Sequence, residues 1–132
     1  MAQVSYLLDT DILVDWLHGR PWTKELLRAK NTNLYCSSVT RKELLSKPGL
    51  RDRERRRVLS LMRHIRVLVV DQGIAAATSE LLAKYASHSL QVEDALIAAT
   101  AWQKKLPLFT RNRKHYEFIT EIQLADLPGF PN

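Results

Sequence analysis

Four short runs of hydrophobic residues predict the β-strands of this chain. They are VSYLL (residues 4–8), NLYCSS (33–38), RVLVV (66–70) and LPLFT (106–110). Each is a nearly continuous apolar run bounded by polar residues, which is typical of strands buried on both faces of a sheet. We therefore expect these four runs to form the interior of the fold.

The stretches between the runs have the periodicity of helices. In GIAAATSELLAKYA (73–86) and ALIAATAW (95–102) the apolar residues recur at intervals of three and four. The arginine-rich segment at 51–66 has the pattern of an amphipathic helix, with apolar positions 58, 59, 61, 62 and 65. Strands that alternate with helices predict the α/β class, with a mainly parallel sheet covered by helices on both sides.

The length and charge of the chain indicate the number of domains and the kind of binding partner. The chain has 132 residues, which suits a single domain over 1–132. Its formal charge of +6, from 20 Lys and Arg against 14 Asp and Glu, suits an anionic partner such as nucleic acid. The basic run RDRERRR (51–57) is either a solvated helix face or a surface for RNA or a protein partner.

The compartment can be predicted from the same composition. Cys36 is the single cysteine, so one chain can form neither a disulfide framework nor a zinc site of thiolates. The N-terminal apolar run is interrupted by acids, unlike a signal peptide, and no apolar segment is long enough to span a bilayer. We therefore expect a cytoplasmic protein without membrane association.

Acidic and amide side chains follow the predicted strands. Asp9 and Asp11 come directly after the first strand, Glu43 lies one turn into the helix after the second, and Asn112 follows the last. Asp94 opens the helix that contains ALIAATAW. Because ligands bind at the carboxyl ends of parallel strands, we expect these residues to converge at one edge of the sheet.

Taken singly, each acid has an ordinary structural explanation. Asp9 with Thr10 can cap a helix that begins at Ile12. Asp94 is an acid in a first helical turn, where the helix dipole favours it, and Glu43 can be a solvated helix residue. Asp15, further along the first helix, is expected to be ordinary surface or a salt-bridge partner.

Taken together, the acids predict a metal site. A hard cation such as Mg²⁺ or Mn²⁺ prefers oxygen ligands, and clustered carboxylates repel one another unless a cation lies among them. Arg111, Arg113 and Lys114 lie beside the predicted cluster and are candidates for holding phosphate. An acidic site in a basic chain is suited to metal-assisted hydrolysis of nucleic acid.

The sequence contains no motif that indicates another class of catalytic site. Four scattered glycines form no phosphate-binding loop, and no GxSxG nucleophile motif is present. The four histidines are far apart and lack metal-ligand spacing. His115 is the one to watch, because it follows the end of a predicted strand.

Four segments together resemble the PIN-domain ribonucleases, and within them the VapC-type toxins of bacterial and archaeal toxin–antitoxin pairs. The segments are LLDTDILVDWL (7–17), SSVTRKELLS (37–46), VEDALIAATA (92–101) and LFTRNRKHYEFI (108–119). The resemblance implies a three-layer α/β/α PIN fold and an endoribonuclease that requires Mg²⁺ or Mn²⁺. It also implies a substrate of tRNA, rRNA or mRNA, a homodimer, and silencing by a cognate antitoxin.

The resemblance carries roles to individual residues. Asp9, Glu43 and Asp94 match the three acids that hold the metal and activate water. Asn112 stands where the family often has a fourth acid, which leaves open whether one or two cations bind, with Asp11 as a partial substitute. Thr10 and Thr110 match hydroxyl positions that orient carboxylates or waters. The implied products carry a 5′-phosphate and a 3′-hydroxyl.

Two other functions are compatible with the sequence. One is a metal-dependent nuclease acting on single-stranded or flap DNA, since no feature of the sequence reads a 2′-hydroxyl. The other is a non-catalytic PIN-like module whose acidic pocket only receives a basic partner segment. The presence of all three acids argues against the second function.

Overall fold

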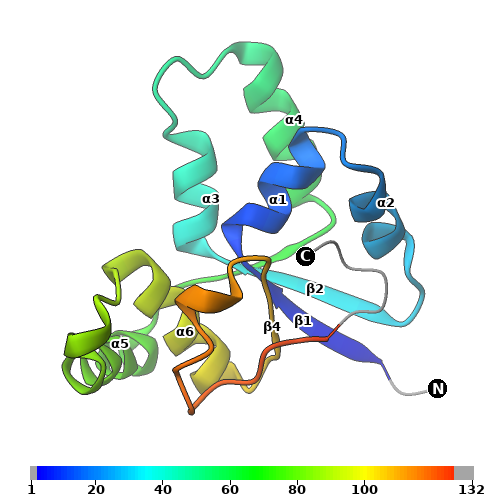
Figure 1. Cartoon of the computed structure of the whole chain (residues 1–132). Coiled ribbons are helices and arrows are strands. Elements are labelled where there is room, and N and C mark those ends of the chain that lie inside the picture. Colours follow the sequence, from blue (N-terminus) through cyan, green and yellow to red (C-terminus); the bar gives the residue numbers. More distant parts are fainter. Residues whose placement is uncertain (1–2, 127–132) are drawn as a thin grey trace.

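A computed structural model describes residues 3–126 of the chain (Figure 1). Four β-strands alternate with six α-helices over these residues, and two single-turn 3₁₀ helices complete the order. The elements are β1 (Val4–Leu8), α1 (Thr10–Leu17), α2 (Pro21–Arg28), β2 (Thr32–Ser37), α3 (Ser38–Leu45), α4 (Asp52–Met62), β3 (Arg66–Leu68), α5 (Gln72–Lys84), η1 (Ala86–His88), α6 (Val92–Lys104), β4 (Leu108–Phe109) and η2 (Arg113–His115).

The strands form one parallel sheet in the order β3-β2-β1-β4. Leu7 pairs with both Tyr35 of β2 and Leu108 of β4, so β1 is a central strand. All three strand pairs are parallel, which confirms the predicted sheet. The strands β3 and β4 are shorter than the apolar runs that predicted them and lie at the two ends of the strand order, and Leu108 of β4 also forms an isolated bridge with Leu124.

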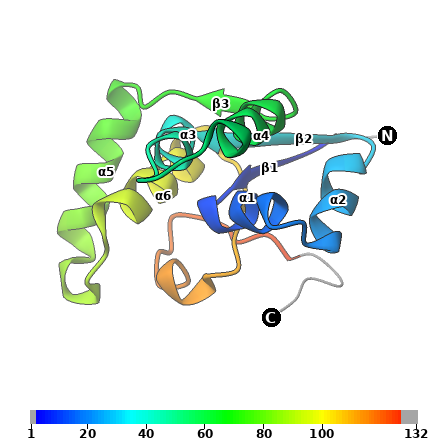
Figure 2. The same ribbon diagram turned by 90° about the horizontal axis from the view of Figure 1, so that it is seen from above.

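Alternate residues of the strands point to opposite faces, and each face has its own core. Leu7 belongs to a cluster with α5 and α6, whereas Leu8 belongs to a cluster with α1, α3 and α4, against which α2 packs. Both side chains are almost fully buried, at 0% and 1% exposure. Figures 1 and 2 show α5 and α6 on the opposite side of the strands from α1 and α2, which is the predicted three-layer α/β/α arrangement.

Three helices begin directly after a strand or a short connection, and each has a side chain that fixes its start. Asp9 caps α1, Ser37 caps α3 and Asp71 caps α5 by accepting hydrogen bonds from backbone N–H groups of the first turn. Because Asp9 directly follows β1 and Ser37 ends β2, the carboxyl edge of the sheet is also the place where α1 and α3 start. In the described part of the chain, no helix is long and apolar enough to cross a membrane.

Candidate active site

One hollow at the carboxyl edge of the sheet gathers all four predicted acids. Its volume is about 430 Å³, and Asn112 and His115 also line it. The acids that line it are Asp9, Asp11, Glu43 and Asp94, accompanied by Glu93. Four different segments of the chain therefore bring acids or amides to one cavity, which is the convergence that the strand ends predicted.

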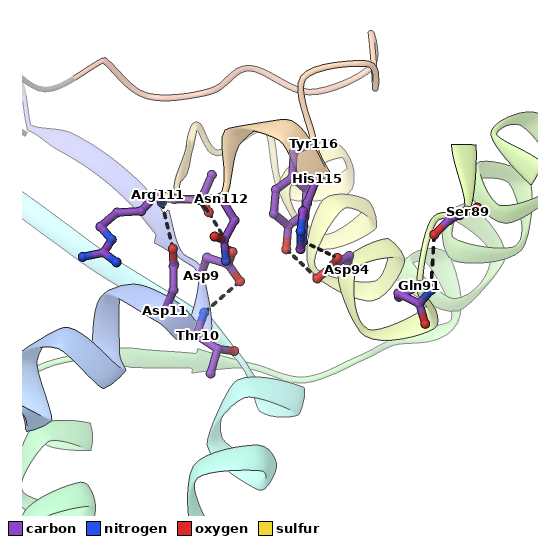
Figure 3. A network of polar contacts seen from close by, with 11 residues as sticks. Asp9, Thr10, Asp11, Ser89, Gln91, Asp94, Arg111, Asn112, His115 and Tyr116 are labelled. Atoms are coloured by element: carbon purple, nitrogen blue, oxygen red, sulfur yellow. Dashed lines mark hydrogen bonds and ion pairs between the residues drawn. The ribbon is translucent and has the colours of Figure 1, made fainter. Parts of the chain in front are cut away.

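Asp9 lies at the floor of this hollow and is held at both carboxylate oxygens. Its side chain is 5% exposed. Oδ1 accepts a hydrogen bond of 2.8 Å from the N–H of Thr10 (Figure 3). Oδ2 accepts one of 2.8 Å from the hydroxyl of Thr110. Asp9 therefore caps α1, as the structural explanation predicted, although α1 begins at Thr10 and not at Ile12. The cap does not remove Asp9 from the hollow, which its side chain still lines.

The pKa values of three acids show that the cluster is short of positive charge. Burial raises the pKa of Asp9, and the negative charge of Asp94 raises it further. Burial and the charge of Asp9 raise the pKa of Asp11 to about 6. Burial and the charges of Asp9, Glu93 and Asp94 raise the pKa of Glu43. A group whose ionised form is disfavoured in this way is stabilised by an added cation.

Asp94 is oriented by two residues that follow β4. The hydroxyl of Tyr116 donates a hydrogen bond of 3.1 Å to Asp94 Oδ1, and His115 Nδ1 lies 3.2 Å from Oδ2 (Figure 3). The sequence singled out His115 but missed Tyr116, whose side chain is fully buried. A buried tyrosine hydroxyl needs a hydrogen-bond partner, so an aromatic residue next to a polar strand end was the signal that could have found it.

Threonine hydroxyls connect the acids to the surrounding backbone. Thr110 both donates to Asp9 and accepts a hydrogen bond of 3.0 Å from the N–H of Asn112. Thr10 shares a hydrogen bond of 3.0 Å with Thr40, which is fully buried on α3. The two predicted threonines therefore contact the predicted site, and Thr40 adds a third that the sequence did not single out.

The predicted phosphate-binding cations have different surroundings. The guanidinium of Arg111 lies 2.8 Å from Asp15 Oδ2, while its backbone N–H donates to Asp11 Oδ2 at 2.8 Å. Arg113 contacts the carbonyl of Ala125 and the carboxylate of Asp126. Lys114 lines a neighbouring hollow.

Asp15 is the salt-bridge partner of Arg111 and not ordinary surface. Its exposure is 6%, and it is one of the three buried residues of α1, with Ile12 and Leu13. The salt bridge therefore ties α1 to the segment that follows β4.

The acids suit a hard divalent cation in their chemistry. They are oxygen donors with disfavoured ionised forms, and Asp11 Oδ1 is buried without a hydrogen-bond partner. Within residues 3–126, however, no three His, Cys, Asp or Glu side chains are already arranged to hold one metal ion. Coordination would therefore require the carboxylates to move closer together.

Comparison with known proteins agrees with this architecture. A model of the PIN domain matches residues 6–119. Ribonuclease VapC10 of Mycobacterium tuberculosis is 32% identical over 121 residues, covering 89% of this chain and 90% of the relative. Ribonuclease VapC1 of Methanocaldococcus jannaschii is 26% identical over the same number of residues, covering 89% and 83%.

Solved structures have the same fold. A toxin–antitoxin complex from Klebsiella pneumoniae contains a chain that is 29% identical, with a TM-score of 0.74 and coverage of 89% of this chain and 94% of that one. VapBC2 from Rickettsia felis, bound to a DNA fragment from its promoter, gives a TM-score of 0.79 at 23% identity, with coverage of 92% and 98%. The second likeness is one of fold alone.

Proposed function

This chain belongs to the PIN-domain family and is similar to its VapC ribonucleases, and we propose that it is a metal-dependent endoribonuclease, the toxin of a toxin–antitoxin pair. The observation that carries the proposal is the hollow in which Asp9, Asp11, Glu43 and Asp94 meet with raised pKa values at three of the four. The relatives named ribonuclease and the toxin–antitoxin complex from Klebsiella pneumoniae support the substrate and the partner.

Asp9, Glu43 and Asp94 would hold Mg²⁺ or Mn²⁺, with Asp11 and Asn112 beside them. A cation bound there supplies activation of water for attack on phosphorus and stabilises the leaving oxygen. The protein's own part is to orient the carboxylates. Thr10 and Thr110 fix Asp9 through both of its oxygens.

Basic residues at the rim of the hollow would position the RNA backbone. Lys114 is exposed and lies next to His115, which lines the acidic hollow. Arg111 and Arg113 are each engaged by an acid, and their side chains remain 41% and 43% exposed, so phosphate can contact them without full dissociation of those pairs. The reaction would be an in-line hydrolysis that leaves a 5′-phosphate and a 3′-hydroxyl.

The proposed partners follow from the same assignment. The substrate would be tRNA, rRNA or mRNA, the protein would act in the cytoplasm as a homodimer, and a cognate antitoxin would silence it. The formal charge of +6 supports an RNA substrate, because phosphate contacts dominate affinity for nucleic acids.

The decisive experiment compares cleavage of total tRNA and a mixed RNA pool by the wild type and by Asp94→Asn. Each reaction is run with Mg²⁺, Mn²⁺ or EDTA, and matched DNA oligonucleotides are run in parallel. We expect cuts in RNA that require the metal and vanish in the variant, whose amide oxygen can still accept the hydrogen bond from Tyr116. Cleavage of DNA in preference to RNA, or equal inertness of both proteins, would contradict the proposal.

A further inference from the structure

A second hollow adjoins the acidic one and differs from it in chemistry. Its volume is about 320 Å³, and it lies between the connection from α5 to α6 and the residues of η2 and beyond. Gln91, Asp94 and His115 line both hollows, so the two are continuous at Asp94. Among residues 3–126, Asp94 is the single carboxylate that lines the second hollow. Lys114 and His88 also line it.

Aromatic rings form one wall of this hollow. The rings of His88 and Phe118 are stacked, with centroids 4.5 Å apart and an interplanar angle of 12°. Tyr85 contacts both rings edge-on, at 5.3 Å from Phe118 and 5.7 Å from His88. Phe118 is half-buried and His88 is exposed, so the stack runs from the core to the solvent, where another planar ring can extend it.

The stack is held in place by a group of polar contacts that we call the Glu121 network, formed by Lys84, Tyr85, Thr120 and Glu121. The hydroxyl of Tyr85 donates to Glu121 Oε1 at 2.6 Å and accepts from the N–H of Thr120 at 3.1 Å. Lys84 Nζ lies 2.8 Å from Glu121 Oε2. These contacts fix the end of α5 against the segment that carries Phe118, so the aromatic wall exists before any ligand binds.

Two polar residues, Ser89 and Gln91, also line this hollow. Ser89 has a left-handed backbone conformation, with φ 54° and ψ 37°, which a residue with a side chain rarely adopts. The side-chain amide of Gln91 donates to the carbonyl of Ser89 at 3.3 Å (Figure 3). That bond uses one N–H of the amide and leaves its carbonyl oxygen as an acceptor on an exposed side chain.

We propose that this second hollow binds one unpaired nucleotide of the RNA, next to the phosphate that is cleaved, and that this subsite gives the enzyme its base preference. The inference rests on the proposed nuclease function. The base would extend the stack of His88 and Phe118, Gln91 would contact the edge of the base, and Lys114 would contact the adjoining phosphate.

Three observations support a nucleotide as the ligand. The volume lies in the range of small-ligand pockets, and bases of single-stranded RNA are recognised by stacking on aromatic side chains and by hydrogen bonds to their edges. Continuity with the acidic hollow at Asp94 places the nucleotide beside the reacting phosphate. Lys114, which is exposed in the lining, suits the phosphate of such a ligand.

The first test uses a random pool of short single-stranded RNA, with the cut ends identified by sequencing. The variants are His88→Ala and Gln91→Ala, and the matched controls are His64→Ala and Gln103→Ala, both at exposed positions outside the hollow. We expect His88→Ala to lower kcat/KM for all sequences by about tenfold, because stacking is tolerant of sequence. Gln91→Ala should flatten the base preference at one position beside the cut and leave other positions unchanged. Unaltered rates and preferences in both variants would overturn the inference, while metal-dependent cleavage by the wild type would still support the nuclease.

The second test measures binding without cleavage, in EDTA. A labelled unstructured RNA is compared with versions in which one base at a time is replaced by an abasic site. In the wild type, removal of the base at one position should weaken binding by about tenfold, and in His88→Ala the same removal should have no further effect. If no position shows this coupling with His88, the subsite is wrong, whether or not the protein cuts RNA.

Discussion

The acidic hollow and the Glu121 network both join segments that are distant in the sequence. The pKa values of their carboxylates are shifted in opposite directions. Burial acts to raise the pKa of Glu121, yet hydrogen bonds from Lys84 and Tyr85 outweigh it and lower that pKa to about 2. In the acidic hollow, burial and neighbouring acids raise the pKa of Asp11 to about 6. One cluster is neutralised within the chain, and the other is not.

This difference indicates what each cluster does. The charge of Glu121 is balanced by a lysine 37 residues away, so the network contributes to the stability of the fold. The acids of the hollow face mainly one another, and that repulsion lowers the stability of the protein without a ligand. A cluster that destabilises its own fold is expected where a cation or a substrate restores the balance.

The largest effect should come from removing a charge from the acidic hollow. We expect Glu43→Gln to lower the rate of RNA cleavage by about 100-fold or more, because one anionic ligand for the cation is lost. Its thermal midpoint in EDTA should hold or rise, because repulsion with Asp9, Glu93 and Asp94 is relieved. Glu80→Gln, at an exposed position on α5, serves as the matched control and should leave the rate unchanged. A full rate with Glu43→Gln would exclude this residue from catalysis.

The second effect concerns the pH dependence of stability in EDTA. The pKa of Asp11 is about 6 in the folded protein against an ordinary value of 3.8, so the folded state binds this proton more tightly than the unfolded state. The free energy of unfolding should therefore fall as pH rises from about 4 to about 6. Asp11→Asn should flatten this part of the profile, measured by urea denaturation at a series of pH values. Addition of Mn²⁺ above pH 6 should raise the stability of the wild type.

The third effect lies in the Glu121 network and has the opposite sign. We expect Glu121→Gln to lower the free energy of unfolding at neutral pH by about 1 kcal/mol, since solvent screens part of the interaction with Lys84. The contribution of Glu121 should be complete above its ordinary pKa of 4.5 and should be lost as pH falls towards about 2. Because the network also holds the aromatic wall of the second hollow, cleavage of RNA by the variant should fall by a few-fold at most when measured well below its melting temperature, far less than with Glu43→Gln. A large loss of activity at unchanged stability would contradict the separation of the two clusters.

The smallest effect is expected from Asn112→Asp, which adds an acid to the hollow. The added carboxylate should lower the Mg²⁺ concentration needed for half-maximal cleavage by several-fold, because it strengthens the attraction for a cation. In EDTA the same variant should be slightly less stable than the wild type. A titration of activity with Mg²⁺ would detect the change, and an unchanged midpoint would place Asn112 outside the coordination sphere.

The sheet could be predicted from the sequence because apolar runs such as residues 4–8 and 33–38 contribute side chains to the cores on both faces, Leu7 and Tyr35 to one and Leu8 and Leu34 to the other. The lengths of β3 and β4 could not, because they depend on which strands occupy the edges of the sheet, and strand order is a property of tertiary packing. The apolar run at 66–70 extends beyond the three residues that pair.

The candidate site also contains residues that the sequence could predict and residues that it could not. Asp9, Asp11 and Glu43 were predictable because each follows a strand or lies one helical turn after one, and parallel strands deliver their ends to one edge. Tyr116 and the salt bridge between Asp15 and Arg111 were not, because their partners lie 22 and 96 residues away in the sequence and no local pattern connects them.

The residues of the acidic hollow are synthesised at widely separated times, because β1 pairs with a strand from the far end of the chain. Asp9 is made early, yet the hydroxyl that orients it belongs to Thr110, which is 101 residues further along the chain. At a synthesis rate of about 5–20 residues per second, the interval between the two residues is about 5–20 s. During this time the growing chain carries the first acid of the hollow without β4, Tyr116 or the far wall of the cavity. The acidic hollow is therefore among the last parts of the fold to form, and the first half of the chain does not contain it.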